Sequence, residues 1–143
     1  MKEPFDYAET LKDKGLKNTK HRNSILRILD ASPCPVAAEE LFLTLREEGV
    51  GISLSSVYRI LESLADKGLV IKSNLTGDGK FLYELQSPEH KHYLICSRCK
   101  RMTPVEGCPL SDYEKHLKET KGFTATGHKL VIYGICRDCL GGK

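Results

Sequence analysis

Apolar residues in the first half of the chain recur every three or four positions, which is typical of amphipathic helices. The pattern predicts four helices, each bounded by a capping residue, a glycine or a proline. They are an opening helix that ends near Gly15, a second after Asn18 or Thr19 that closes before Pro35, a third over residues 37–48, and a fourth over residues 54–67. Ser53 precedes the fourth segment and is its predicted N-cap.

The pattern changes after Gly68. Residues 69–74 and 80–85 are predicted to form two short strands, and Gly77-Asp78-Gly79 between them is a strong hairpin signal. Helices followed by a two-stranded hairpin are the parts of a winged helix. The first half is therefore predicted to be a winged-helix domain.

Near residue 85 the helical periodicity gives way to a segment that holds five of the six cysteines and four of the five histidines. An alternating run over residues 90–96 predicts a strand, residues 110–121 a polar helix, and residues 129–133 a further strand. The sequence thus predicts an α+β protein, with one domain over residues 1–85 and a small α/β domain over residues 86–143.

Composition narrows the class of protein. The chain has 143 residues, 40% of them hydrophobic and 29% charged, which fits a globular protein and excludes a large multidomain enzyme. No apolar run approaches the roughly 20 residues of a membrane span, and the amino terminus lacks the features of a signal peptide. We therefore expect no membrane association and a cytoplasmic location, where clustered thiols usually bind metal.

Two C-x-x-C pairs stand out, Cys96 with Cys99 and Cys136 with Cys139. This spacing lets two thiolates of each pair reach one tetrahedral zinc ion. A redox pair or structural disulfides are the alternatives, but the first expects a single pair near a βαβ unit and the second expects export. Four thiolates leave no open position for water, so a Zn²⁺ ion here is expected to be structural.

A second metal site is suggested by His90 and His92, which share one face of the predicted strand. Glu84 at the end of the hairpin is a candidate carboxylate ligand that would link the two halves of the chain. Cys34 and Glu106 are further candidates. A pair of solvated surface histidines is the ordinary alternative.

The net charge of +3 hides a local concentration of cations. Residues 11–27 hold six cations and one acid, and the cations include Lys17, Lys20 and Arg22. Basic groups at the start of a helix suit phosphates, whereas the outward residues of the fourth helix suit base edges in a major groove. Together the candidate DNA-binding residues are Lys17, Thr19, Lys20, Arg22, Ser55, Ser56, Tyr58 and Arg59. A solvated helix face is the alternative for the charges, and a core position is the alternative for Tyr58.

Four segments resemble, in order, the ferric uptake regulator family: residues 15–22, 53–61, 90–99 and 127–139. The resemblance implies a dimeric bacterial metalloregulator with an amino-terminal winged helix and a carboxy-terminal α/β dimerisation domain. It implies that Val57-Tyr58-Arg59 lies on the recognition helix and that metal at the hinge sets the DNA-binding arrangement. The family's structural zinc cysteines correspond to the two C-x-x-C pairs, and its sensing ligands to Glu84, His90 and His92.

The sequence departs from the family pattern at several metal positions. Cys34-Pro35 stands where many relatives have a histidine, Lys91 where an aspartate often serves a further site, and Pro104 near a usual carboxylate. A histidine of that further site is retained as His128, and Glu106 is a replacement for the carboxylate. A thiolate among imidazoles favours zinc over iron or manganese, and residues 105–110 and 126–129 resemble the zinc-uptake regulators more closely.

We therefore expect a repressor of metal-uptake genes that binds a pseudo-palindromic double-stranded DNA operator as a homodimer. The expected effector is a second divalent metal, Zn²⁺ in preference to Fe²⁺ or Mn²⁺. The alternatives are an iron- or peroxide-sensing member of the same family or, from other classes, a zinc-dependent enzyme or a metal-storage module. An enzyme is not favoured, because the zinc deaminase signature H-x-E…P-C-x-x-C is absent.

Overall fold

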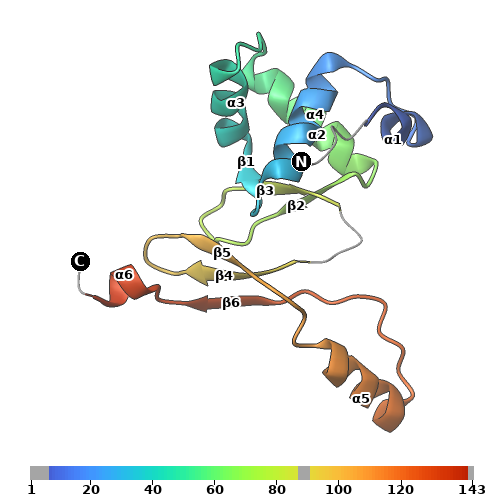
Figure 1. Ribbon diagram of the computed structural model, residues 1–143, viewed down its shortest axis with the longest axis vertical. Helices are drawn as coiled ribbons and strands as arrows, with labels where there is room; N and C mark the ends of the chain where they lie inside the picture. Colours follow the sequence, from blue (N-terminus) through green and yellow to red (C-terminus); the bar gives the residue numbers. More distant parts are fainter. Residues whose placement is uncertain (1–6, 87–90, 142–143) are drawn as a thin grey trace. The chain divides into compact units, whose positions relative to one another are not determined.

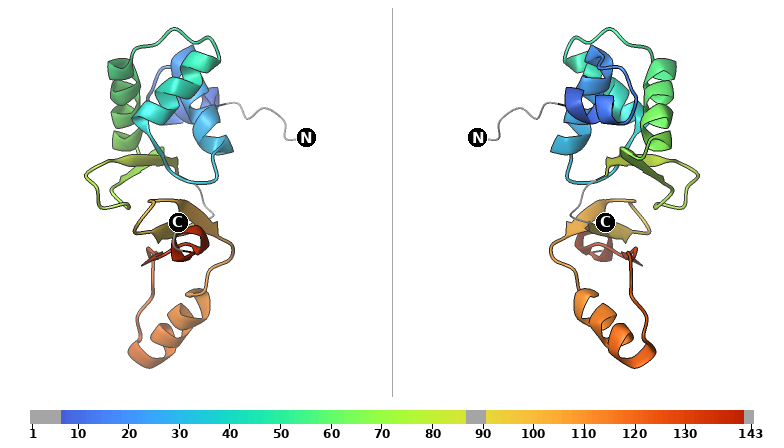
Figure 2. Two further views of the ribbon diagram at one scale, coloured as in Figure 1. Left: turned by 90° about the vertical axis from the view of Figure 1, so that its left-hand side faces the viewer. Right: turned by 90° about the vertical axis from the view of Figure 1, so that its right-hand side faces the viewer.

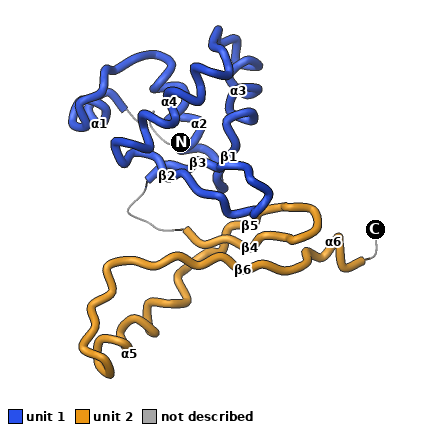
Figure 3. The backbone as a smooth tube through the Cα atoms, turned by 180° about the vertical axis from the view of Figure 1, so that it is seen from behind, with its two compact units in different colours: residues 1–87 blue, residues 88–143 orange. Residues whose placement is uncertain are grey.

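The computed structural model describes residues 7–86 and 91–141. The chain divides into two compact units, Met1–Ser87 and Pro88–Lys143, which Figure 3 draws in different colours. In the described residues, no helix combines the length and the apolar character that a membrane span needs.

The first unit begins with four helices. They are α1 (Ala8–Asp13), α2 (Lys20–Ala31), α3 (Ala38–Glu47) and α4 (Leu54–Asp66), in the order that the periodicity predicts (Figure 1). Side-chain caps fix two of the starts: the Thr19 hydroxyl accepts a hydrogen bond from the Arg22 amide, and the Ser53 hydroxyl accepts one from the Ser56 amide. Each cap satisfies a backbone donor that the helix leaves without an intrahelical partner.

The helices of the first unit bury their apolar stripes against one another. The cluster of buried residues includes Ile25 and Leu29 of α2, Leu41 of α3, and Val57 and Leu61 of α4. Burial at helical spacing leaves the opposite face of α4 in solvent, where Ser55, Tyr58 and Arg59 lie. The core thereby fixes which residues α4 presents outward.

A three-stranded antiparallel sheet completes the first unit, with the strand order β1-β3-β2. It consists of β1 (Val36–Ala37), β2 (Val70–Ser73) and β3 (Leu82–Leu85), and it lies at one end of the helices in both views of Figure 2. β2 and β3 form the predicted hairpin, in which Lys72 pairs with Tyr83. The sequence pattern missed β1, because two residues are too few to show an alternation.

The second unit also has a three-stranded sheet, with the strand order β5-β4-β6, accompanied by two helices (Figure 1). The strands are β4 (His92–Cys96), β5 (Met102–Val105) and β6 (Val131–Gly134), and the helices are α5 (Ser111–Lys121) and α6 (Arg137–Leu140). β4 pairs antiparallel with β5 and parallel with β6. This pairing brings the ends of β4 and β6, and with them the two C-x-x-C pairs, to one end of the sheet.

Two elements of the second unit were not predicted. β5 contains Pro104, which lacks a backbone donor and argues against a central strand, but β5 lies at the edge of the sheet, where proline is tolerated. α6 begins just after Cys136 of the second C-x-x-C pair and has only four residues, which is too short for a periodic pattern. The predicted strand over residues 90–96 begins at His92 in the described residues, and His90 lies outside them.

Candidate functional site

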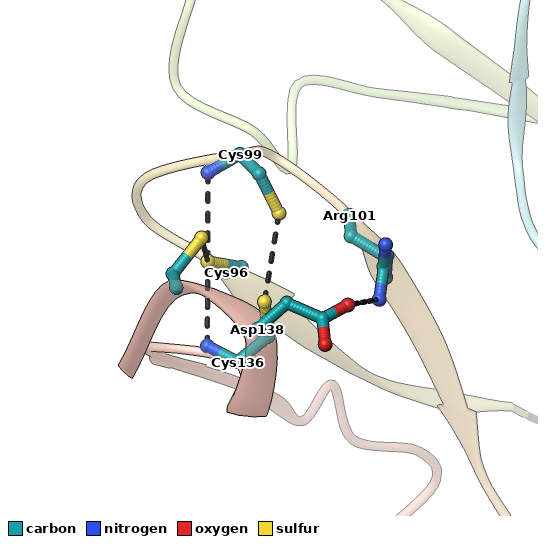
Figure 4. A network of polar contacts seen from close by, with 6 residues as sticks. Cys96, Cys99, Arg101, Cys136 and Asp138 are labelled. Carbon is teal, nitrogen blue, oxygen red and sulfur yellow. Dashed lines mark hydrogen bonds and ion pairs between the residues drawn. The ribbon is translucent and has the colours of Figure 1, made fainter. Parts of the chain in front are cut away.

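The four cysteines of the C-x-x-C pairs converge at one end of the second sheet (Figure 4). Cys96 Sγ lies 3.7 Å from Cys139 Sγ, and Cys99 Sγ lies 3.7 Å from Cys136 Sγ. Sulfur atoms each about 2.3 Å from a central zinc ion lie about 3.8 Å from one another at tetrahedral angles. The thiols therefore have the spacing of a tetrahedral zinc site, and their donor set fits Zn²⁺.

Backbone amides favour a thiolate at the centre of this cluster. The amides of Cys99 and Cys136 donate to Cys96 Sγ over 3.5 Å and 3.4 Å (Figure 4). These hydrogen bonds, that from Cys136 first, lower the pKa of Cys96 to about 5. Hydrogen bonds with Cys136 and Cys96 raise the pKa of Cys139 to about 12, because its thiol proton is shared with its neighbours. Once one cysteine is a thiolate, deprotonation of its neighbours is disfavoured, because the negative charges repel one another. A divalent cation bound between the sulfur atoms removes that repulsion.

Polar contacts join the two pairs outside the sulfur cluster. Arg101 Nη1 lies 2.9 Å from Asp138 Oδ2, as Figure 4 shows, and Arg98 Nη1 donates to the Cys139 carbonyl oxygen over 3.2 Å. Both side chains of the ion pair are exposed, so its contribution to stability is small. These contacts align the chain around the site, and the cysteines supply its ligands.

A second group of metal-ligating side chains lies within the second unit. His92, Cys108 and His128 place one ligand atom each within 4.8 Å of the others. His128 Nε2 lies 3.0 Å from His92 Nε2 and 3.2 Å from Cys108 Sγ. Of these residues the sequence predicted His92 as a ligand and noted His128, but it left Cys108 without a role. Cys108 lies in a loop, where neither periodicity nor a C-x-x-C partner could have marked it.

The five residues proposed from sequence as regulatory ligands are distributed over both units. Glu84 is half-buried on β3, and Cys34 is half-buried between α2 and β1, both in the first unit. His92 is buried at the start of β4 in the second unit, and Glu106 is exposed just after β5. His90 lies outside the described residues. Within either unit, the structure does not bring this set together.

The predicted DNA-binding residues lie on two segments of the first unit. Lys17 and Lys20 are exposed at the start of α2, whereas Thr19 and Arg22 are half-buried. Thr19 caps the helix, and Arg22 Nη1 donates to the Lys17 carbonyl oxygen over 2.9 Å. The basic loop before α2 is therefore held by its own side chains, while the two lysines remain accessible to phosphate.

The second segment is the outer face of α4. Arg59 Nη2 donates to Ser56 Oγ over 3.2 Å, and the Tyr58 hydroxyl donates to the Glu39 carboxylate of α3. This bond raises the pKa of Tyr58 and lowers that of Glu39. Tyr58 is 37% exposed, so the alternative of a core position for it is wrong. Hydroxyl and guanidinium groups thus line an exposed helix face that can meet base edges.

Known proteins of similar sequence and structure combine a DNA-binding unit and metal sites in one chain. A sequence profile described as the ferric uptake regulator family matches residues 13–133. The ferric uptake regulation protein of Legionella pneumophila is 36% identical over 136 residues, which cover 94% of this chain and 99% of that protein.

Two solved structures are each 32% identical to this chain. The ferric uptake regulator of Vibrio cholerae has a TM-score of 0.77, over 92% of this chain and 100% of that one. FurB of M. tuberculosis, a zinc uptake regulator, has a TM-score of 0.50, over 84% of this chain and 92% of that one. Likeness in sequence therefore does not separate an iron regulator from a zinc regulator here.

Three observations point to the same family. They are the helical unit with its basic and polar faces, the four-cysteine cluster and the profile match over most of the chain. The chain belongs to the ferric uptake regulator family of DNA-binding, metal-responsive transcription regulators.

Proposed function

We propose that this protein is a homodimeric repressor of metal-uptake genes, and that a divalent metal ion controls its binding to a pseudo-palindromic operator. One observation carries the proposal: the same chain combines a winged helix that exposes basic and polar side chains with a unit that holds a tetrahedral set of thiols. Because the proposed target is DNA, the proposal includes a cytoplasmic location.

The DNA-binding part of the proposal assigns phosphate contacts to the start of α2 and base contacts to α4. Lys17 and Lys20 before and at the start of α2 are suited to phosphates, which position a protein on the duplex without reading sequence. Ser55, Tyr58 and Arg59 on α4 are suited to base edges in the major groove. A winged helix that presents α4 in this way is a reader of double-stranded DNA.

The homodimer is supported by the exposed face of the second sheet. Leu94 and Ile132 are register partners on β4 and β6, and they are 41% and 51% exposed. In the described part of the chain α5 has no buried residue, so it does not bury an apolar stripe of its own against this face. An apolar sheet face that a monomer leaves in water is typical of a protein interface, and a second copy is its proposed partner.

Two metals have separate proposed roles. Zn²⁺ bound by the four cysteines would be structural, since four protein ligands close its coordination sphere. A second ion would be regulatory, with ligands drawn from Glu84, His90, His92, Cys34 and Glu106. An ion that binds one domain arrangement better than another shifts the population toward it, and moving a ratio of 1:99 to 99:1 takes about 5.5 kcal/mol.

Zinc is the favoured regulatory metal because Cys34 offers a thiolate, and thiolate ligands favour zinc over manganese and iron. The curated relatives that are named ferric uptake regulation proteins favour iron as the second candidate. A peroxide-sensing role is the remaining alternative within the family. A zinc-dependent enzyme or a metal store would use the thiols without the DNA-binding face.

The test is a titration of operator binding, by gel shift, with zinc, iron and manganese added separately to protein that retains its structural zinc. We expect zinc to strengthen binding at the lowest free concentration. The double variant His90→Ala, His92→Ala should lose this dependence, while His116→Ala, an exposed histidine of α5, should keep it. An unchanged metal dependence in the double variant would contradict the ligand assignment. If iron strengthens operator binding at a lower free concentration than zinc does, iron and not zinc is the effector.

A further inference from the structure

The loop between β5 and α5 brings a cysteine thiol to a buried and a half-buried histidine. His92 begins β4 and is 1% exposed, His128 lies in the segment before β6, and Cys108 lies in the loop after β5. The two imidazole rings stack with centroids 4.9 Å apart and planes 22° apart. Three segments distant in sequence thus direct a nitrogen or sulfur ligand atom to one point inside the second unit.

The contacts of His128 favour one of its two tautomers. His128 Nδ1 contacts the carboxylate of Glu114 on α5, and this contact favours the tautomer with the proton on Nδ1. The lone pair of His128 Nε2 then faces both His92 Nε2 and Cys108 Sγ. The lone pair of His128 Nε2 cannot accept good hydrogen bonds from both of these neighbours at once. A cation at this point can instead accept a lone pair from each of the three ligand atoms.

The distances are close to those of a metal site. For a tetrahedral zinc ion with bonds of about 2.0 Å to nitrogen and 2.3 Å to sulfur, the nitrogens lie about 3.3 Å apart and nitrogen and sulfur about 3.5 Å apart. His128 Nε2 lies 3.0 Å from His92 Nε2 and 3.2 Å from Cys108 Sγ, about 0.3 Å less than these values. All three ligand atoms lie within 4.8 Å of one another, so small side-chain shifts would bring them to one ion.

The geometry points to a metal site within the second unit that is distinct from the four-cysteine cluster. We propose that Cys108 Sγ, His92 Nε2 and His128 Nε2 bind one Zn²⁺ ion and that Glu114 orients His128. The inference goes beyond the proposed function, because Cys108, His128 and Glu114 are not among its ligands and the binding requires no DNA. His92 is a candidate in both sets, and its assignment to this site leaves the regulatory ion to the other four candidates. The thiolate of Cys108 makes the site selective for zinc, since Mn²⁺ and Fe²⁺ prefer oxygen and nitrogen ligands.

The ligands leave a fourth position, as is usual when a zinc ion has three protein ligands. Glu114 is near enough to His128 to serve as its hydrogen-bond partner, which fixes the orientation of the ring. The carboxylate therefore acts on the metal through His128 and is a positioning residue. The identity of the thiolate ligand is the part of this assignment that the experiment addresses first.

Cobalt(II) is a suitable probe, because a thiolate ligand gives it an intense charge-transfer absorption that nitrogen and oxygen ligands do not. Full-length protein would receive one equivalent of zinc per chain to fill the four-cysteine site, and Co²⁺ would then be titrated. In a Cys34→Ser background, which removes the thiolate of the proposed regulatory site, we expect a charge-transfer band and its loss when Cys108→Ser is added. His116→Ala, which removes an exposed histidine of α5, is the control and should keep the band.

Every outcome decides the assignment. A band that survives when Cys108→Ser is added, or no band in the Cys34→Ser background, overturns it. Neither result depends on the proposed regulatory site, whose thiolate is absent from this background. Bound zinc and far-ultraviolet circular dichroism, measured on each variant, show that the four-cysteine site and the fold persist. If Cys108→Ser does not fold, Cys108→Ala with the same readouts replaces it.

The positioning role of Glu114 has its own readout. Glu114→Gln should weaken Co²⁺ binding about 10–100-fold while leaving the charge-transfer band in place at saturation, because the thiolate ligand is retained. Glu119→Gln changes an exposed carboxylate of the same helix and should leave the affinity unchanged. Equal affinities of the two variants would exclude an effect of Glu114 on the metal.

Discussion

At the scale of single residues, Arg59 is the side chain on which sequence recognition depends most in our proposal. It is exposed on α4 and donates to Ser56 of the same helix over 3.2 Å, a contact it can exchange for a base. Arg59→Ala should cost about 1–3 kcal/mol of operator affinity and relax specificity if the guanidinium reads a base. Competition between operator and random DNA measures this, and an equal loss on both would identify a phosphate contact.

Lys20 should act differently, because an exposed ammonium at the start of α2 is suited to a phosphate. Lys20→Ala should weaken binding to operator and random DNA alike and reduce the slope of log affinity against log salt by about 1. Affinities measured over a series of salt concentrations give the slope. Lys115→Ala, on exposed α5, is the control that should leave it unchanged, and an unchanged slope in Lys20→Ala would remove Lys20 from the interface.

Single residues also show where the sequence was informative. The C-x-x-C spacing predicted four cysteines whose sulfur atoms the structure brings together, because two residues of separation constrain each pair locally. Cys108 carried no such signal. Its neighbours in space, His92 and His128, are 16 and 20 residues away along the chain, and only the paired strands bring them together.

At the scale of elements, the start of α2 joins stability to DNA binding. The Thr19 hydroxyl accepts from the Arg22 amide over 3.2 Å and so caps the helix. Thr19→Ala should lower the free energy of unfolding by about 1 kcal/mol through loss of the cap, as measured by denaturant unfolding. Thr19→Ser keeps the capping oxygen and should stay close to the wild type. Equal destabilisation of both variants would show that the methyl group, and not the cap, matters.

The helices of the first unit could be predicted because their burial follows one local period. Leu41 and Leu45 of α3, and Val57, Leu61 and Leu64 of α4, lie one turn apart and are all buried. The strands β1 and β5 could not be predicted in this way. β1 has two residues and β5 contains Pro104, so both depend on an open edge of β3 or β4 to pair with.

At the scale of the whole molecule, the proposed homodimer should depend on the apolar face of the second sheet. Ile132→Glu combined with Leu94→Glu should shift the protein from dimer to monomer, because charges do not tolerate burial in an interface without partners. Sedimentation velocity over a range of concentrations measures the shift. Leu43→Glu, at a 55% exposed position on α3, is the matched control, and a dimer that survives the double variant would place the interface elsewhere.

The two units also differ in what holds them together. The main cluster of buried apolar residues belongs entirely to the first unit. In the described part of the second unit, the buried residues are His92, Tyr93, Ile95 and Cys96, all on β4. Small units with little core usually need a metal or a partner for stability. Zinc at the four cysteines is the proposed source of that stability here.

Removal of this zinc with a chelator should therefore unfold the second unit and leave the first largely intact. Hydrogen exchange measures the effect, and we expect protection to be lost in β4 and β6 but kept in α2 and α4. Cys136→Ser should produce the same pattern without a chelator. Full protection of β4 and β6 after the metal has been removed would show that the thiols do not carry the stability of this unit.

The sequence by itself determined the helices of the first unit, the hairpin, the two C-x-x-C pairs and the basic segment before α2. Each of these follows from residues close together in the chain, where period, spacing and capping are local properties. Only the tertiary structure decided that β1 and β5 join the sheets, that Leu94 and Ile132 remain exposed, and that Cys108 meets His92 and His128. The physical reason is that strand pairing and ligand convergence depend on contacts between distant segments, which no local pattern records.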